Sequence, residues 1–171
     1  VHHDHLLASL SEAGVSRHQR VYAPSGRDLT VNDLIQEALR DFRPDERETE
    51  WSALAFALWL PPVKSWQTTQ GRTVTFDMVA KRLMRGERQI GVCSGTHRVY
   101  SLMLLWRLDQ EYDLLSDEIN AEVYAHLESV RDVIMLSQFP VGHWPPNWPD
   151  GRETTLKDQP VDQTIEVQWP P

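Results

Sequence analysis

The sequence predicts an all-α domain of antiparallel helical hairpins, followed by an extended, proline-rich arm. Apolar residues recur at helical spacing from residue 4 to residue 138. Two predicted helices are apolar on all sides and alternate with amphipathic helices, a pattern typical of an inner ring of helices wrapped by an outer ring. Prolines are frequent after Phe139 and exclude long helices there. We therefore place a helical domain in residues 1–151 and an extended C-terminal arm in residues 152–171.

The first two helices are amphipathic. Residues 4–13 place three leucines on one face, and Gly14 is a helix stop signal. Thr30 caps a second helix, whose stripe of apolar residues runs from Val31 to Leu39 and which ends near Phe42, because Pro44 disfavours helical backbone at the residue before it. The intervening residues 15–28 are predicted to be irregular, with a turn at residues 24–26.

The third helix, residues 45–60, is predicted to be buried because its second half has no polar face. A loop over residues 64–73 follows, and Thr75 caps an amphipathic helix over residues 76–85. The fifth helix, residues 96–111, is apolar over most of its circumference and is predicted to be the second buried helix. Ser116 caps the sixth, amphipathic helix, residues 117–138.

Composition limits the classes of partner. The chain has 171 residues, enough for one hydrophobic core, with 40% hydrophobic and 25% charged residues. Its formal net charge of −8 argues against nucleic acid as a partner and against a polybasic membrane-binding segment. The longest uncharged apolar run, residues 53–60, is too short to span a membrane. We expect a cytoplasmic protein.

Metals and cofactors are not predicted. Cys93 is the only cysteine, so neither an intrachain disulfide nor a zinc site with several thiolate ligands can form. His2, His3 and His5 crowd the N-terminus, a position more typical of an unstructured end than of a metal site. Whether they bind a metal stays open at this point.

The loop after the sixth helix carries a spaced motif. Residues 138–144 have glutamine at Gln138, glycine at Gly142 and tryptophan at Trp144. This arrangement resembles the QW loop repeat of squalene and hopene cyclases and of related α/α-toroid proteins such as the prenyltransferases. The resemblance implies a partial toroid, completed by a second half or a second copy of the chain, and a structural role for the loop. The acid motif of the terpene cyclases and the zinc ligands of the prenyltransferases are absent from this sequence. The resemblance therefore implies the architecture of these proteins and not their activity.

The densest group of reactive residues precedes the fifth helix. Gly91 and Gly95 flank a turn that contains Cys93 and Ser94 and runs into Thr96 and His97. A helix N-terminus favours anions and thiolates, so Cys93 is a candidate nucleophile with His97 as its base, and Ser94 and Thr96 are candidate ligand-binding residues. The alternative is structural: a small buried cysteine, a capping hydroxyl and a hydrogen-bonded core histidine.

Two further groups are candidates. Glu50 lies where the third helix becomes apolar, so its carboxyl group is a candidate catalytic acid in a cavity; the alternative is a role at the positive end of the helix. Trp144 and Trp148 are candidates for an aromatic platform that binds a sugar or an isoprenoid, and packing is the alternative.

Two functions remain open from the sequence. The first is a toroid-like binding or scaffolding module with a central cavity. The second is an enzyme that acts on a hydrophobic, isoprenoid-like or carbohydrate substrate in that cavity. They differ in whether Glu50, Cys93 and His97 converge on a cavity.

Overall fold

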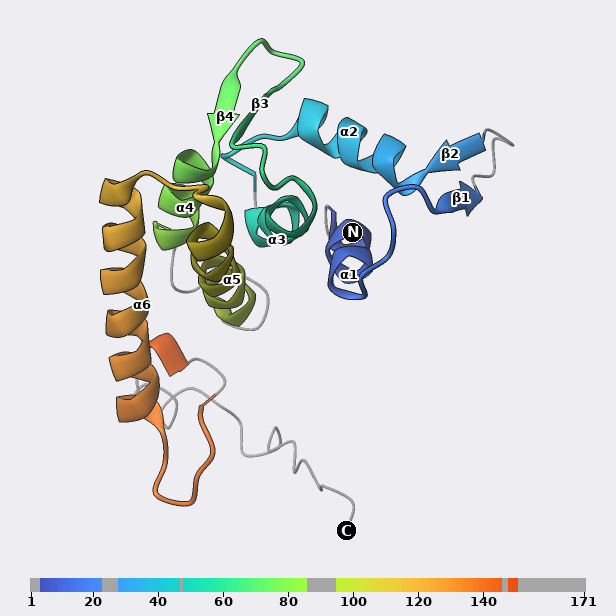
Figure 1. Cartoon of the computed structure of the whole chain (residues 1–171). Helices are drawn as coiled ribbons and strands as arrows, with labels where there is room; N and C mark the ends of the chain where they lie inside the picture. The colour runs from blue at the N-terminus through green and yellow to red at the C-terminus, as the bar shows by residue number, and fades with distance from the viewer. Residues whose placement is uncertain (1–3, 23–27, 47, 86–94, 146–147, 151–171) are drawn as a thin grey trace.

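The part of the chain that the structure describes forms six α-helices and two small β-hairpins, which are labelled in Figure 1. The computed structural model describes residues 4–22, 28–46, 48–85, 95–145 and 148–150. The helices are α1 (His5–Glu12), α2 (Val31–Asp41), α3 (Thr49–Trp59), α4 (Phe76–Met84), α5 (Thr96–Tyr112) and α6 (Asp117–Ser137), followed by a short 3₁₀ helix, η2 (Trp148–Asp150).

The all-α prediction is wrong, because the chain contains two antiparallel hairpins and is a mixed α/β structure. Strand β1 (Arg20–Tyr22) pairs with β2 (Asp28–Thr30), and β3 (Ser65–Gln67) pairs with β4 (Thr73–Thr75). A domain made only of helical hairpins of the α/α-toroid type is therefore also excluded. Each strand has three residues, too few for the alternation of apolar and polar residues that identifies a strand.

The helix starts follow the predicted caps. Thr30 and Asp33 form a capping box at the start of α2. The Thr75 hydroxyl accepts a hydrogen bond from the Met78 backbone at 3.3 Å, and the Ser116 hydroxyl accepts one from Ile119 at 3.5 Å. These side chains satisfy backbone N–H groups that would otherwise lack partners.

Helix α3 is the centre of the fold, as its apolar sequence predicts. It lies between α1 and α5 (Figure 1), and every residue from Thr49 to Ala57 is buried. Alanines at positions 53, 55 and 57 allow neighbouring backbones to approach closely, and Phe56 and Leu54 fill the remaining space.

The prediction for α5 is only partly correct. One face, with Ser101, Leu102 and Leu105, is buried, but Met103 is 48% exposed and Tyr100 is also exposed. Helix α5 is therefore covered by α3, α4 and α6 and is open to solvent on its remaining side.

The second hairpin is part of the hydrophobic core. Trp66 on β3 packs edge-on against Phe42, Phe56 and Phe76, with ring centroids 5.2–5.6 Å apart. Val74, the partner of Trp66 across the hairpin, is fully buried. The hairpin thus closes the part of the core that lies between α2, α3 and α4.

Other predictions about organisation lie partly outside the described residues. The C-terminal arm, residues 152–171, lies outside them altogether, so the division at residue 151 stays a prediction. Among the residues that the structure describes, no helix combines the length and apolar character needed to cross a membrane.

We predict that Phe56→Ala lowers the free energy of unfolding by about 3–5 kcal/mol, because a large, fully buried ring is replaced by a cavity. Tyr22→Ala is the matched control, since Tyr22 is 91% exposed, and its effect is expected to stay within about 0.5 kcal/mol. Urea denaturation followed by circular dichroism measures both. Equal losses in the two variants would contradict the position of Phe56 in the core.

Candidate functional site

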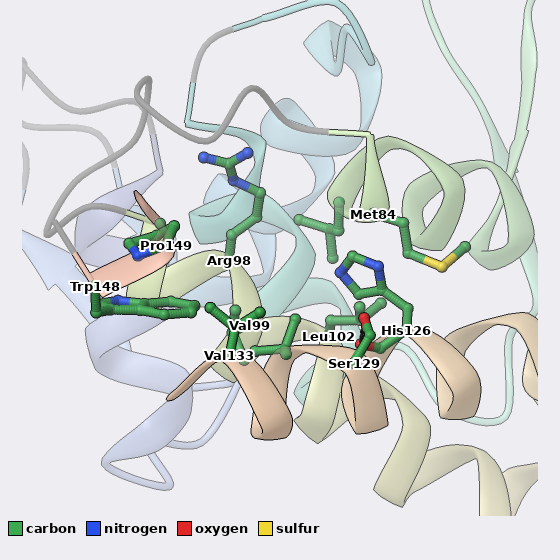
Figure 2. Close-up of a pocket in the computed structure, with 12 residues that line it drawn as sticks. Met84, Arg98, Val99, Leu102, His126, Ser129, Val133, Trp148 and Pro149 are labelled. Atoms are coloured by element: carbon green, nitrogen blue, oxygen red, sulfur yellow. Dashed lines mark hydrogen bonds between the residues drawn. The ribbon is translucent and has the colours of Figure 1, made fainter. Parts of the chain in front are cut away.

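A pocket of about 280 Å³ lies between α4, α5, α6 and η2 (Figure 2). Its wall is mainly aliphatic, with three polar side chains and one tryptophan. The described residues that line it are Leu83, Met84, Gly95, Arg98, Val99, Leu102, His126, Ser129, Val130, Val133, Trp148 and Pro149.

Helical periodicity places most of these side chains. His126, Ser129, Val130 and Val133 follow the i, i+3, i+4, i+7 spacing and therefore share one face of α6. Arg98, Val99 and Leu102 occupy the first two turns of α5 on the side that faces α6. The end of α4 supplies Leu83 and Met84. Three helices thus each present one face to the same space.

The short helix η2 forms the remaining wall. The Trp148 indole N–H donates a hydrogen bond to the Thr96 hydroxyl at 3.2 Å. The Ser137 hydroxyl lies 2.8 Å from the Trp148 carbonyl oxygen and is almost fully buried. These contacts attach η2 to the start of α5 and to the end of α6, and they hold the indole in the pocket wall.

Among the described residues that line the pocket, Arg98 carries a permanent charge. Arg98 is only 9% exposed, and the guanidinium group stays protonated in proteins. None of the described lining residues is acidic. The described part of the pocket wall therefore contributes positive charge, although the chain as a whole has a net charge of −8.

His126 adds a neutral hydrogen-bonding group. Burial lowers the pKa of His126 below its ordinary value of 6.5, so its imidazole is mainly neutral at pH 7. The neighbouring Ser129 hydroxyl donates to the His126 carbonyl oxygen at 2.7 Å. The imidazole can donate one hydrogen bond and accept another.

Two predicted catalytic residues, Glu50 and His97, lie where α3 and α5 contact each other, outside the pocket wall. The Trp51 and His97 rings are 4.4 Å apart, and the Ser101 hydroxyl donates to the Glu50 carbonyl oxygen at 3.0 Å. Cys93 and Ser94, which the sequence placed in the same turn, lie outside the described residues. Glu50 and His97 do not line the α4–α5–α6 pocket.

Glu50 is a buried acid without a hydrogen bond at one oxygen. It is 2% exposed, and its Oε1 has no hydrogen-bond partner in the described part of the chain. The adjacent Trp51 lies between His5 and His97, with 4.4 Å between ring centroids on each side. Within the described residues, no group of three or more His, Cys, Asp or Glu side chains is arranged to hold a metal ion, and His2 and His3 lie outside them.

The predicted ligand-binding residues have different positions. Trp148 lines the pocket, and Thr96 holds its indole. Trp144 does not line the pocket; it is 46% exposed, and its indole N–H donates to the Ile134 carbonyl oxygen at 2.8 Å. Trp144 and Trp148 therefore do not line the same pocket, as the predicted aromatic platform would require.

The loop with the QW-like spacing is held by two side chains. Besides the bond from Trp144, the Gln138 amide donates to the Gly142 carbonyl oxygen at 2.9 Å. These bonds tie the loop to itself and to the last turn of α6. Similarity to the QW repeat stays a prediction, because a structural role of this kind is not specific to one family.

Sequence reasoning missed Arg98, His126 and Ser129. The signal for His126 and Ser129 was their position on the same stripe of α6 as Val130 and Val133. Arg98 directly follows His97, but its burial and its place in the pocket wall depend on how α5 packs against its neighbours.

No family model, curated protein or solved structure matches this chain. The function is therefore argued from the geometry of the site.

We predict that the stability of the protein falls as the pH is lowered below about 6.5, in part because of His126. Its pKa is lower in the folded than in the unfolded chain, so the unfolded chain binds a proton first. This part of the stability is complete above pH 6.5 and is lost as the pH falls toward and below the folded pKa. His126→Gln should show a smaller loss between pH 7 and pH 5 in urea denaturation. Identical pH dependence in the two proteins would contradict the burial of the imidazole.

Proposed function

We propose that this chain is a binding domain for a small, largely apolar molecule, which occupies the α4–α5–α6 pocket. The observation that carries the proposal is an apolar pocket with a few polar groups in defined positions, which is the usual composition of a small-molecule site. Its volume of about 280 Å³ is near the lower end for such sites and favours a small ligand.

Each part of the wall has a function in this proposal. Val99, Leu102, Val130 and Val133 provide apolar contact, and Trp148 provides a flat surface of large area. The neutral imidazole of His126 and the oxygen of Ser129 offer hydrogen bonds that orient the ligand. The proposal keeps the binding function expected from the sequence and replaces the central cavity of a toroid by a pocket between three helices.

We predict that 1-octanol binds saturably and that Val133→Trp weakens its binding at least about tenfold, since the indole fills the space that the ligand needs. Isothermal titration calorimetry measures the affinities. Val63→Trp is the control, because Val63 is exposed and outside the pocket, and its affinity should match that of the unmodified protein. Failure of octanol to bind the unmodified protein, or equal affinities in all three proteins, would overturn the proposal.

A second candidate function is catalysis at the neighbouring N-terminal ends of α3 and α5. The observation that favours it is the unpaired oxygen of Glu50, because buried polar atoms usually have partners and exceptions often serve a reaction. The ring of His97 contacts Trp51, the residue that follows Glu50 in the chain, and an imidazole is a common acid–base group in catalysis. A hydroxyl group of a carbohydrate substrate, or the polar end of an isoprenoid-like one, would supply the missing hydrogen bond to Glu50.

We predict that Glu50→Met raises the free energy of unfolding by about 1–3 kcal/mol, because an unpaired buried oxygen is removed at similar side-chain volume. Glu122→Met is the control, as Glu122 is exposed on α6, and its effect should stay within about 0.5 kcal/mol. A stabilised variant would mean that Glu50 is not kept for stability, as expected of a functional residue. A clear loss of stability would instead assign Glu50 a structural role and remove the support for catalysis.

A further inference from the structure

The polar groups of the pocket are distributed unevenly. Figure 2 shows Arg98 near Trp148 and Pro149, while His126 and Met84 lie toward the opposite end. The aliphatic side chains of Val99, Leu102 and Val133 lie between them. A ligand that fills the pocket therefore meets a cation at one end, an apolar middle section and a neutral imidazole at the other end.

The burial of Arg98 strengthens the attraction between its guanidinium group and an anion in the pocket. Arg98 is 91% buried, and an interaction between charges at a given distance is stronger in an environment of low dielectric constant than in water. Arg98 also has an interaction within the chain, and a guanidinium group with five N–H donors can bind a further acceptor. No described lining residue carries a negative charge that would repel an anion.

The start of α5 adds to the attraction for an anion. Gly95 lines the pocket and is the N-cap residue of this 17-residue helix, which has no side-chain cap and no acidic residue in its first turn. No acidic side chain of this first turn therefore offsets the positive end of the helix dipole. Gly95 has a φ of +83°, and a Cβ at this position would contact Arg98 Nη2 at 3.5 Å. Glycine thus permits the left-handed turn that places the start of α5 beside the guanidinium group.

We propose that the ligand of the α4–α5–α6 pocket is a small amphiphilic anion, whose carboxylate or phosphate group binds Arg98 and the start of α5 while its apolar part packs against Val99, Leu102 and Val133. This inference rests on the proposed binding function and names its ligand class. A carboxylate or a phosphate forms two parallel hydrogen bonds with a guanidinium group, which an alcohol cannot form. An alkylammonium ion would be repelled by the same group.

The test compares ligands with one chain length and different head groups. Octanoate, octyl phosphate, 1-octanol and octylammonium are titrated against the whole chain at pH 7 by isothermal titration calorimetry. At least one anion should bind about tenfold or more tightly than octanol, since a charge-assisted hydrogen bond contributes more than a neutral one. Octylammonium should bind most weakly. The tighter of the two anions identifies the head group as a carboxylate or a phosphate, and either result supports the proposal.

Two variants assign the effect to Arg98. In Arg98→Gln the ratio of anion to octanol affinity should fall to about one, whereas Arg107→Gln, on an exposed part of α5, should keep the ratio of the unmodified protein. Arg98→Lys, which keeps the charge without the planar fork, should keep part of the preference. If Arg98→Gln fails to fold, the four ligands are compared in the unmodified protein and in Arg98→Lys. A smaller preference for the anions in Arg98→Lys then supports the role of Arg98, and an unchanged preference contradicts it.

The outcomes separate this inference from the function on which it rests. Equal binding of octanol and both anions overturns the anion inference and leaves the apolar binding site in place. A preference for the anions that survives in Arg98→Gln also overturns it, because another group would then provide the charge. Absence of saturable octanol binding contradicts the proposed function itself, on which this inference rests.

Discussion

The burial of α3 on all sides is the constraint on which the rest of the structure depends. A helix without a polar face exposes apolar side chains to water unless other elements cover its whole circumference. Helices α1 and α5 cover two sides, and the alanines of α3 allow them to pack closely. The remaining side is covered by α4 and by the aromatic group that Trp66 completes with Phe42, Phe56 and Phe76. The β3–β4 hairpin is therefore part of the core and is needed to cover α3.

The pocket follows from the way α5 is fixed to α3. The hydrogen bond from Ser101 to the Glu50 carbonyl group and the contact between Trp51 and His97 hold one side of α5 against α3. The side with Val99 and Leu102 then faces α6. Helix α6 packs on α4 and α5, with Ile119 and Val123 buried near its start. Its valines and His126 further along face the pocket, a space that the described helices leave unfilled. Trp148, tied to Thr96, closes part of that space.

The helices were predictable because their signals are local. Apolar spacing and the caps Thr30, Thr75 and Ser116 placed α2, α4 and α6 within a few residues of their observed bounds. The hairpins were missed, since three-residue strands carry almost no periodic signal; the alternation around Trp66 and Val74 was the only indication. The sequence singled out Thr96 and Trp148 as ligand-binding residues, and that role stays a prediction, although Trp148 lines the pocket and donates a hydrogen bond to Thr96. The positions of Arg98 and His126 depend on how three helices pack, which local spacing does not determine.

The first turn of α5 has neighbours on two sides of the helix. Consecutive residues of a helix point in directions about 100° apart, so His97 and Arg98 face different surroundings. His97 contacts Trp51, next to the buried Glu50, and Arg98 lines the pocket. A ligand that binds Arg98 acts on the same turn that holds His97 against Trp51. Packed helices move as units and do not deform continuously. The pocket beside Arg98 and the candidate site beside Glu50 therefore share α5 as one rigid element. The position of α5 relative to α3 affects the geometry of both sites.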